Sequence, residues 1–409
     1  MKKVFKYLQD QALEASNQKY SGASYLSPRG KEPQQRVRHH SPSQYKDEHN
    51  THHQGRSEHP SSAAHSFPAH TAAGTTMPKS TASPRISDEI QRGITRHQYA
   101  QDNILQSYEV YIPEGDDKTL VDSKTHEYWI LYIHGGYFRD PAVTSSSFYP
   151  ALELLASKKH HQLHRHVFTN GHHSSQSADI KPYIGGYASI NYRLSPHPDK
   201  APQDPQKTPT YELRNAKWPD HILDTLTAIA HLQKKYGFGE RYVLVGHSVG
   251  ATMAFLSTLA PQKAPFSGLK GIEMPKIELP MVILGVSGIY DFPLLHESFP
   301  EYIAMTRNAI HNEADDALAS PARYAVKDYV DIWTAGGTRR RALVIAHSRD
   351  DGWVDWKQVD AMKNVFAGET GVDVSVIEMK GQHNAIWEKG TELARVIVQA
   401  VGVMRGLEQ

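Results

Sequence analysis

The sequence has 409 residues, enough for one large α/β domain with accessory sequence. Its 45 Lys and Arg residues nearly balance its 44 Asp and Glu residues, so the net charge of +1 creates no field that would hold nucleic acid or an anionic membrane. The chain contains no cysteine, which excludes disulfides, thiolate metal ligands and a cysteine nucleophile.

The N-terminal residues, 1–92, are dominated by Ser, Pro, His, Gln and Thr, and we expect them to form a low-complexity, disordered tail. A short helix over residues 1–15 is the one element expected there. The beginning of the chain lacks the apolar core and cleavage site of a secretory signal. No apolar run is long enough to cross a bilayer. These features favour a cytoplasmic protein.

From residue 93 to residue 409, apolar runs alternate with amphipathic patterns, which predicts one α/β domain with a mostly parallel central sheet and helices on both of its faces. Apolar stripes over 222–232 and 393–404 predict two of the helices. A polar, His-rich insertion at 158–183 and a Pro-rich stretch at 198–209 are expected to be surface loops. The predicted strands lie at 108–113, 128–134, 187–194, 241–247, 281–287, 341–347 and 374–379.

The nucleophile is predicted from Gly246-His247-Ser248-Val249-Gly250, which fits the pattern G-x-S-x-G. A predicted strand runs directly into it and the small-residue start of a helix follows, as in the nucleophile elbow of the α/β hydrolases. Glycines are needed there because the serine backbone is strained and its neighbours approach closely. Ser248 is therefore the expected nucleophile, with the Val249 amide as an oxyanion donor. An ordinary β-to-α turn is the alternative interpretation.

The rest of the oxyanion hole is predicted at His134-Gly135-Gly136-Tyr137-Phe138, which follows the strand expected at 128–134. An HGG turn in this position supplies backbone N–H groups to the oxyanion hole of related hydrolases. We assign the donors to the amides of Gly136 and Tyr137, together with Val249. The alternative is a glycine turn that only ends the strand.

The acid and base should follow the serine in the order Asp, then His. The acid should lie in the loop after the strand at 341–347. Asp351 is preferred there, because the spacing H-x-x-x-D from His347, followed by a short turn into a helix, is usual in related hydrolases, and Asp350 is the second candidate. His383 is the preferred base, because it is the one histidine in the loop between the last strand and the last helix. His347 is the competing base, although it would reverse the expected order.

Several other polar and aromatic residues have two interpretations. The histidines of the 158–183 insertion are better explained by composition than by a metal site, so neither a metal nor a cofactor is expected. Asp291 is expected to form a turn or helix cap rather than face the active site. Three tryptophans near the acid and base in the sequence could equally line an aromatic pocket or belong to the core: Trp353, Trp356 and Trp387.

Over roughly residues 97 to 405 the chain resembles fungal kynurenine formamidase, an arylformamidase of the α/β-hydrolase superfamily. The two hydrolase motifs indicate only the superfamily, and the combination of flanking motifs points to this branch. The family motif is HGGXW, and Phe138 stands where the tryptophan is expected. The matching stretches are Tyr132-Ile133-His134-Gly135-Gly136, Arg139-Asp140-Pro141, Asn191-Tyr192-Arg193-Leu194-Ser195-Pro196, Gly246-His247-Ser248-Val249-Gly250-Ala251, Gly288-Ile289-Tyr290-Asp291, 351–355 and Gln382-His383-Asn384.

The resemblance implies hydrolysis of N-formyl-L-kynurenine to L-kynurenine and formate, a step of tryptophan degradation, and it allows a homodimer. Ser248 would attack the formyl carbonyl and expel the aryl amine. The alternative enzyme is a general carboxylesterase of the hormone-sensitive-lipase type, which shares the HGG motif and the elbow. A non-catalytic binding protein on the same fold is the third hypothesis, and the presence of all three triad candidates argues against it.

Overall fold

The computed structural model describes residues 86–113, 128–157, 180–259, 274–329, 341–368 and 372–408. The helix predicted at 1–15 and most of the 158–183 insertion lie outside these residues. The chain from Ala82 to Gln409 forms one compact unit. It contains helix α2 (Asp88–Gly93), whose Ile90 is buried, so the folded part begins a few residues before the predicted boundary at 93.

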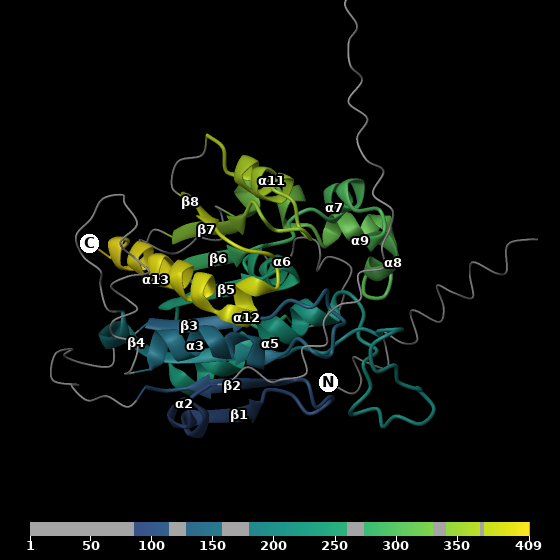
Figure 1. The fold of residues 1–409 in the computed structure, drawn as a ribbon, viewed down its shortest axis with the longest axis horizontal. Coiled ribbons are helices and arrows are strands. Elements are labelled where there is room, and N and C mark those ends of the chain that lie inside the picture. Colours follow the sequence, from purple (N-terminus) through teal and green to yellow (C-terminus); the bar gives the residue numbers. More distant parts are fainter. Residues whose placement is uncertain are drawn as a thin grey trace, which may run out of the picture. The chain divides into compact units, whose positions relative to one another are not determined.

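The centre of this unit is an eight-stranded sheet with the order β1-β2-β4-β3-β5-β6-β7-β8 (Figure 1). The six strands from β4 to β8 in this order are parallel, β2 is antiparallel to β4, and β1 is antiparallel to β2. The mostly parallel sheet expected from the sequence is therefore confirmed. The strands are β1 (Ile94–Gln98), β2 (Ser107–Tyr111), β3 (Tyr128–Ile133), β4 (Ile184–Ile190), β5 (Tyr242–His247), β6 (Val282–Val286), β7 (Arg341–Ser348) and β8 (Val372–Met379).

Helices cover both faces of the sheet. Successive side chains of a strand point to opposite faces, so a strand that is apolar throughout must be covered on both sides. In β5, Tyr242 and Leu244 pack with one layer and Val243 and Val245 with the other. Helices α5 (Asp220–Tyr236), α6 (Val249–Leu256) and α11 (Lys357–Val365) contribute to the first layer. Helices α3 (Tyr149–Ala156), α12 (Ala385–Lys389) and α13 (Thr391–Gly406) contribute to the second layer. This is the α/β-hydrolase arrangement.

Short helices follow β6 and lie close to one another, and the first of them also contacts α11 (Figure 1). They are α7 (Phe292–Ser298), α8 (Tyr302–Thr306) and α9 (Glu313–Leu318), and the short 3₁₀ helices are η2 (Ser145–Phe148), η4 (Lys181–Tyr183) and η5 (Pro321–Arg323). The Pro-rich stretch at 198–209 contains no helix or strand, as expected. Within the described ranges, no helix is long and apolar enough to cross a membrane.

Strand β4 differs most from its predicted bounds: it runs over Ile184–Ile190 instead of 187–194. Its early residues include Gly186, and a Cβ there would lie 2.6 Å from the Trp129 ring. The glycine is therefore inside the strand because a tryptophan of β3 occupies the place of its side chain. The residues after Ile190, which look strand-like in sequence, form an extended segment beyond the sheet.

Candidate active site

The predicted nucleophile lies in a tight turn between β5 and α6. Ser248 has φ +57° and ψ −123°, a conformation that L-residues rarely adopt and that marks functional sites when the surroundings hold it. A Cβ on Gly246 would lie 2.2 Å from the Gly250 carbonyl oxygen, and one on Gly250 would lie 2.2 Å from the Ile133 carbonyl oxygen. Backbone atoms cannot move aside as a flexible side chain can, so both glycines of the motif are sterically required.

The HGG turn lies against this serine. A Cβ on Gly135 would be 2.9 Å from the Cβ of Ser248, so the loop after β3 and the elbow after β5 meet where their parallel strands end side by side. The next three residues all have positive φ: +87° for Gly136, +50° for Tyr137 and +65° for Phe138. Two non-glycine residues in this region indicate a turn whose shape is held by its surroundings.

Three backbone amides, in the HGG turn and at the start of α6, have no hydrogen-bond acceptor in the part of the chain that the structure describes. Among the described residues, the N–H groups of Gly136, Tyr137 and Val249 donate no hydrogen bond, and the side chains around them are largely buried. Val249 is the first residue of α6, where an N–H has no partner within the helix. Unpaired N–H groups of this kind can stabilise a developing oxyanion.

The predicted acid and base are in direct contact. His383 Nδ1 lies 2.8 Å from Asp351 Oδ2, and both side chains are almost completely buried. The other oxygen, Oδ1, accepts hydrogen bonds from the Trp353 and Val354 amides, each at 3.0 Å. Burial alone would raise the pKa of Asp351, but the hydrogen bond and charge of His383, together with the Trp353 amide and His347, lower it to about 2. The carboxylate is thus ionised throughout the neutral range and fixes the orientation of the imidazole.

The contact between serine and histidine is indirect in this structure. The His383 ring lies next to the His247 ring, with their centroids 4.7 Å apart, and His247 is the residue before Ser248. Among the described residues, Ser248 Oγ makes no hydrogen bond, so the serine-to-histidine bond of a complete triad is not formed. Such bonds are often long in ligand-free enzymes and tighten when substrate binds.

The competing acid and base have other environments. Asp350 is exposed, whereas Asp351 is buried against His383. His347 is fully buried, and its Nε2 lies 3.0 Å from the Val354 carbonyl oxygen, so it supports the loop that carries Asp351. The geometry therefore brings together the preferred pair, and neither alternative lies in its place.

Aromatic side chains surround the acid–base pair. The Trp353 ring is 40% exposed and stacks on the His383 ring at a centroid distance of 5.5 Å. Tyr137 packs edge-on against Tyr302 of α8 at 5.8 Å. Burial, together with the nearby charges of Glu301 and Asp351, raises the pKa of Tyr302 to about 12. No sequence pattern indicates Tyr302, because α8 is short and carries no motif.

Phe138, which stands in place of the family tryptophan, does not face this site. Its side chain is fully buried, with ring centroids 4.7 Å from His221, 6.1 Å from Phe292 and 6.3 Å from Trp218. The residue therefore packs the HGG turn onto the core beside α5. Its substitution changes the packing beneath the turn rather than the surface that a substrate would contact.

The remaining residues with two interpretations have structural roles. Asp291 caps α7 by accepting a hydrogen bond from the Leu294 amide at 3.0 Å, and it pairs with Arg323, as the cap interpretation predicted. Trp356 packs under the Arg349 guanidinium, and Trp387 packs partly buried against the second apolar layer.

The His-rich insertion lies mostly outside the described residues, including the histidines considered for a metal site: His160, His161, His164, His166, His172 and His173. The parts of the chain that the structure does describe contain no group of three or more side chains able to hold a metal ion.

Comparisons with known proteins identify the family to which the chain belongs. No family model matches the chain. The kynurenine formamidase-like hydrolase fscH of Fusarium equiseti is 30% identical over 74% of this chain and 91% of its own length. The kynurenine formamidase avaC of Aspergillus versicolor is 29% identical over 66% of this chain and 87% of its own. Esterase B of Lactobacillus rhamnosis shares the fold, with a TM-score of 0.50, 14% identity and coverage of 79% of this chain and 87% of its own. The chain therefore belongs to the kynurenine formamidase family of α/β-fold hydrolases.

Proposed function

We propose that this hydrolase is an arylformamidase that converts N-formyl-L-kynurenine to L-kynurenine and formate, with Ser248, His383 and Asp351 as its catalytic triad. The observation that carries the triad is the buried 2.8 Å contact between His383 and Asp351 beside the strained serine turn. The substrate is supported by the curated relatives that carry the name kynurenine formamidase.

In the acylation step, Ser248 Oγ attacks the formyl carbon and its proton passes to Nε2 of His383, while Asp351 stabilises the imidazolium through Nδ1–H. The carbonyl oxygen becomes an oxyanion that accepts hydrogen bonds from the amides of Gly136, Tyr137 and Val249. Collapse of this intermediate breaks the C–N bond, and the proton on His383 passes to the departing aryl amine. The formyl group then remains on the serine oxygen as an ester.

In the second step, His383 takes a proton from water, whose oxygen attacks the formyl ester, and the proton then returns to Ser248 as formate leaves. The aryl amine requires aromatic contacts near the triad. The exposed ring of Trp353, stacked on His383, is the best-placed group for this purpose. Tyr137 of the HGG turn and Tyr302 of α8, which pack against each other, are further candidates.

The cellular setting is also a proposal. The proposed location is the cytoplasm. The family resemblance allows a homodimer. The expected partner is a small molecule, and we expect the protein to bind neither nucleic acid nor a membrane.

Formate release tests the substrate assignment. Purified protein should release formate from N-formyl-L-kynurenine with a kcat/KM at least about tenfold above that for p-nitrophenyl acetate or butyrate, because the aromatic surroundings contact the kynurenine ring. Equal or faster ester hydrolysis, without formate release, would instead favour the general carboxylesterase. A Trp353→Ala variant provides a second comparison: its KM should rise for the formamide and change little for the acetate ester.

A further inference from the structure

The segment Asn191–Pro196, which follows β4, is one of the stretches shared with the family, and the triad gives it no role. It lies beyond the strand, yet the residues from Asn191 to Ser195 are all buried. Tyr192 is fully buried, and its ring stacks on that of His134 with a centroid distance of 4.3 Å and an interplanar angle of 14°. A buried tyrosine hydroxyl needs a hydrogen-bond partner, and the partners found here belong to the HGG turn.

Tyr192 Oη donates to the Gly135 carbonyl oxygen at 2.8 Å, with the His134 carbonyl oxygen as a second acceptor at 3.2 Å. In a trans peptide the C=O and N–H groups point in opposite directions. The Gly135 carbonyl and the Gly136 N–H belong to the same peptide, so a hydrogen bond that holds the carbonyl on the Tyr192 side directs the N–H away from it. A hydrogen-bonded carbonyl also makes the N–H of the same peptide a better donor.

The other peptides of the turn are held in the same way. The Gly136 carbonyl accepts hydrogen bonds from the Arg139 and Asp140 amides at 3.0 and 2.8 Å, which fixes the direction of the Tyr137 N–H. The Phe138 carbonyl accepts from the Ser195 amide at 2.9 Å. The segment after β4 therefore holds the turn at both ends. Two side chains contact the Gly135 carbonyl oxygen: Tyr192 through its hydroxyl, and His134, whose Nδ1 lies 2.9 Å away and whose ring stacks on that of Tyr192.

We infer that Tyr192 is a positioning residue that aims the Gly136 N–H at the oxyanion, and that the segment 191–196 is the scaffold of the oxyanion hole. The inference rests on the proposed function, because it assumes that Ser248 forms a tetrahedral intermediate. Without the tyrosine hydroxyl, the Gly135 carbonyl would keep only the side-chain contact from His134, its neighbour in the same turn, and the Gly135–Gly136 peptide would be free to rotate with that turn. The amide would still be present but no longer aligned with the developing charge.

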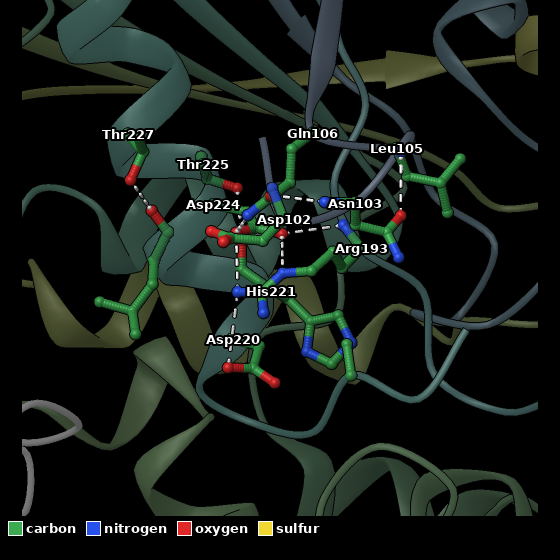
Figure 2. A network of polar contacts seen from close by, with 12 residues as sticks. Asp102, Asn103, Leu105, Gln106, Arg193, Asp220, His221, Asp224, Thr225 and Thr227 are labelled. Atoms are coloured by element: carbon green, nitrogen blue, oxygen red, sulfur yellow. Dashed lines mark hydrogen bonds and ion pairs between the residues drawn. The ribbon is translucent and has the colours of Figure 1, made fainter. Parts of the chain in front are cut away.

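A buried ionic network holds the backbone on the far side of Tyr192. Arg193 donates from its backbone N and from Nε to Asp224 Oδ2, at 2.9 and 2.8 Å, and from Nη2 to Oδ1 at 2.8 Å. Figure 2 shows this network. Asp224 of α5 also accepts a hydrogen bond from Gln106 Nε2, and Arg193 also forms an ion pair with Asp220. A bidentate, buried Arg–Asp pair is geometrically specific. It therefore fixes residue 193, and with it the place from which the Tyr192 side chain reaches the turn.

The test is Tyr192→Phe, which keeps the ring and removes only the hydroxyl. We expect kcat for N-formyl-L-kynurenine and for p-nitrophenyl acetate to fall by a similar factor of about 10 to 100, less than the 10² to 10³ typical of losing a donor outright. KM should change by less than about twofold, because the hydrogen bond acts on the transition state. The rate of inactivation by a small fluorophosphonate should fall together with kcat.

The matched control is Tyr242→Phe. Tyr242 is equally buried and its hydroxyl donates to the Glu278 carbonyl oxygen at 2.8 Å, but it lies at the start of β5, the end of the strand away from Ser248. Both variants should lose similar thermal stability, and only Tyr192→Phe should lose turnover. An unchanged kcat, a loss confined to KM, or an equal loss in the control would overturn the inference.

The ester and the fluorophosphonate separate this inference from the substrate proposal. Wild-type protein that reacts with both but releases no formate would contradict the formamidase assignment and leave the Tyr192 comparison intact. Wild-type protein that reacts with none of the three reagents would overturn both proposals.

Discussion

Ser248→Ala should lower the turnover of N-formyl-L-kynurenine by about 10⁴ to 10⁶ while the protein stays folded, because the substitution removes the nucleophile and leaves the turn intact. The backbone contacts of this residue do not depend on its side chain: the Ser248 amide donates to the Val286 carbonyl oxygen at 2.9 Å, and the Ser248 carbonyl accepts from the Ala251 amide at 3.0 Å. Initial rates at saturating substrate, with circular dichroism spectra of both proteins, measure the effect.

Ser257→Ala is the appropriate control for this experiment. Ser257 is also buried and belongs to the end of α6, where its hydroxyl donates to the Ala254 carbonyl oxygen at 2.8 Å. Its loss should cost roughly 1 kcal/mol of folding stability and little activity. If Ser248→Ala retained wild-type turnover, the serine mechanism would be wrong.

Asp351→Asn should lower kcat by about 10⁴ without disturbing the loop. The amide oxygen of asparagine can still accept from Trp353 and Val354, which now donate to Oδ1. Its NH₂ group, however, would donate to Nδ1 of His383, so the remaining ring proton would sit on Nε2, where the base must be free to receive the serine proton. Steady-state kinetics of the variant over the neutral pH range would measure the loss.

Asp350→Asn is the matched control, because the neighbouring carboxylate is exposed and lies outside the pair with His383. It should keep nearly full activity. If kcat fell more for Asp350→Asn than for Asp351→Asn, Asp351 would not be the acid, and the arrangement described for the loop after β7 would be contradicted.

The central part of the fold is predictable from sequence because its strands are buried on both faces and read as apolar runs. Strand β1 carries no such run: at the edge of the sheet, Thr95 and Arg96 are exposed and the other residues are half-buried. The start of β4 is also hidden, since Gly185 and Gly186 are typical of a turn and only the Trp129 ring explains a glycine there. Neither β1 nor the start of β4 is predicted, because each forms through contacts with segments that are distant in the sequence.

The site shows the same division between local and long-range information. The elbow, the HGG turn and the loop positions of Asp351 and His383 follow from motifs and from the direction of parallel strands. The choice between residues 350 and 351 depends on which side chain turns inward. The burial of Phe138, the stacking of Trp353 on His383 and the bond from Tyr192 to the turn depend on contacts between distant segments, so no local pattern indicates them.

The most direct test of the central claim is to identify the nucleophilic side chain by covalent labelling. Wild-type protein treated with a small fluorophosphonate and digested should carry one phosphonyl adduct, and fragment masses should place it on Ser248. Asp351→Asn should react far more slowly, because its His383 is in the wrong tautomer to activate the serine. An adduct on another residue, or equal labelling of wild type and Ser248→Ala, would contradict the account.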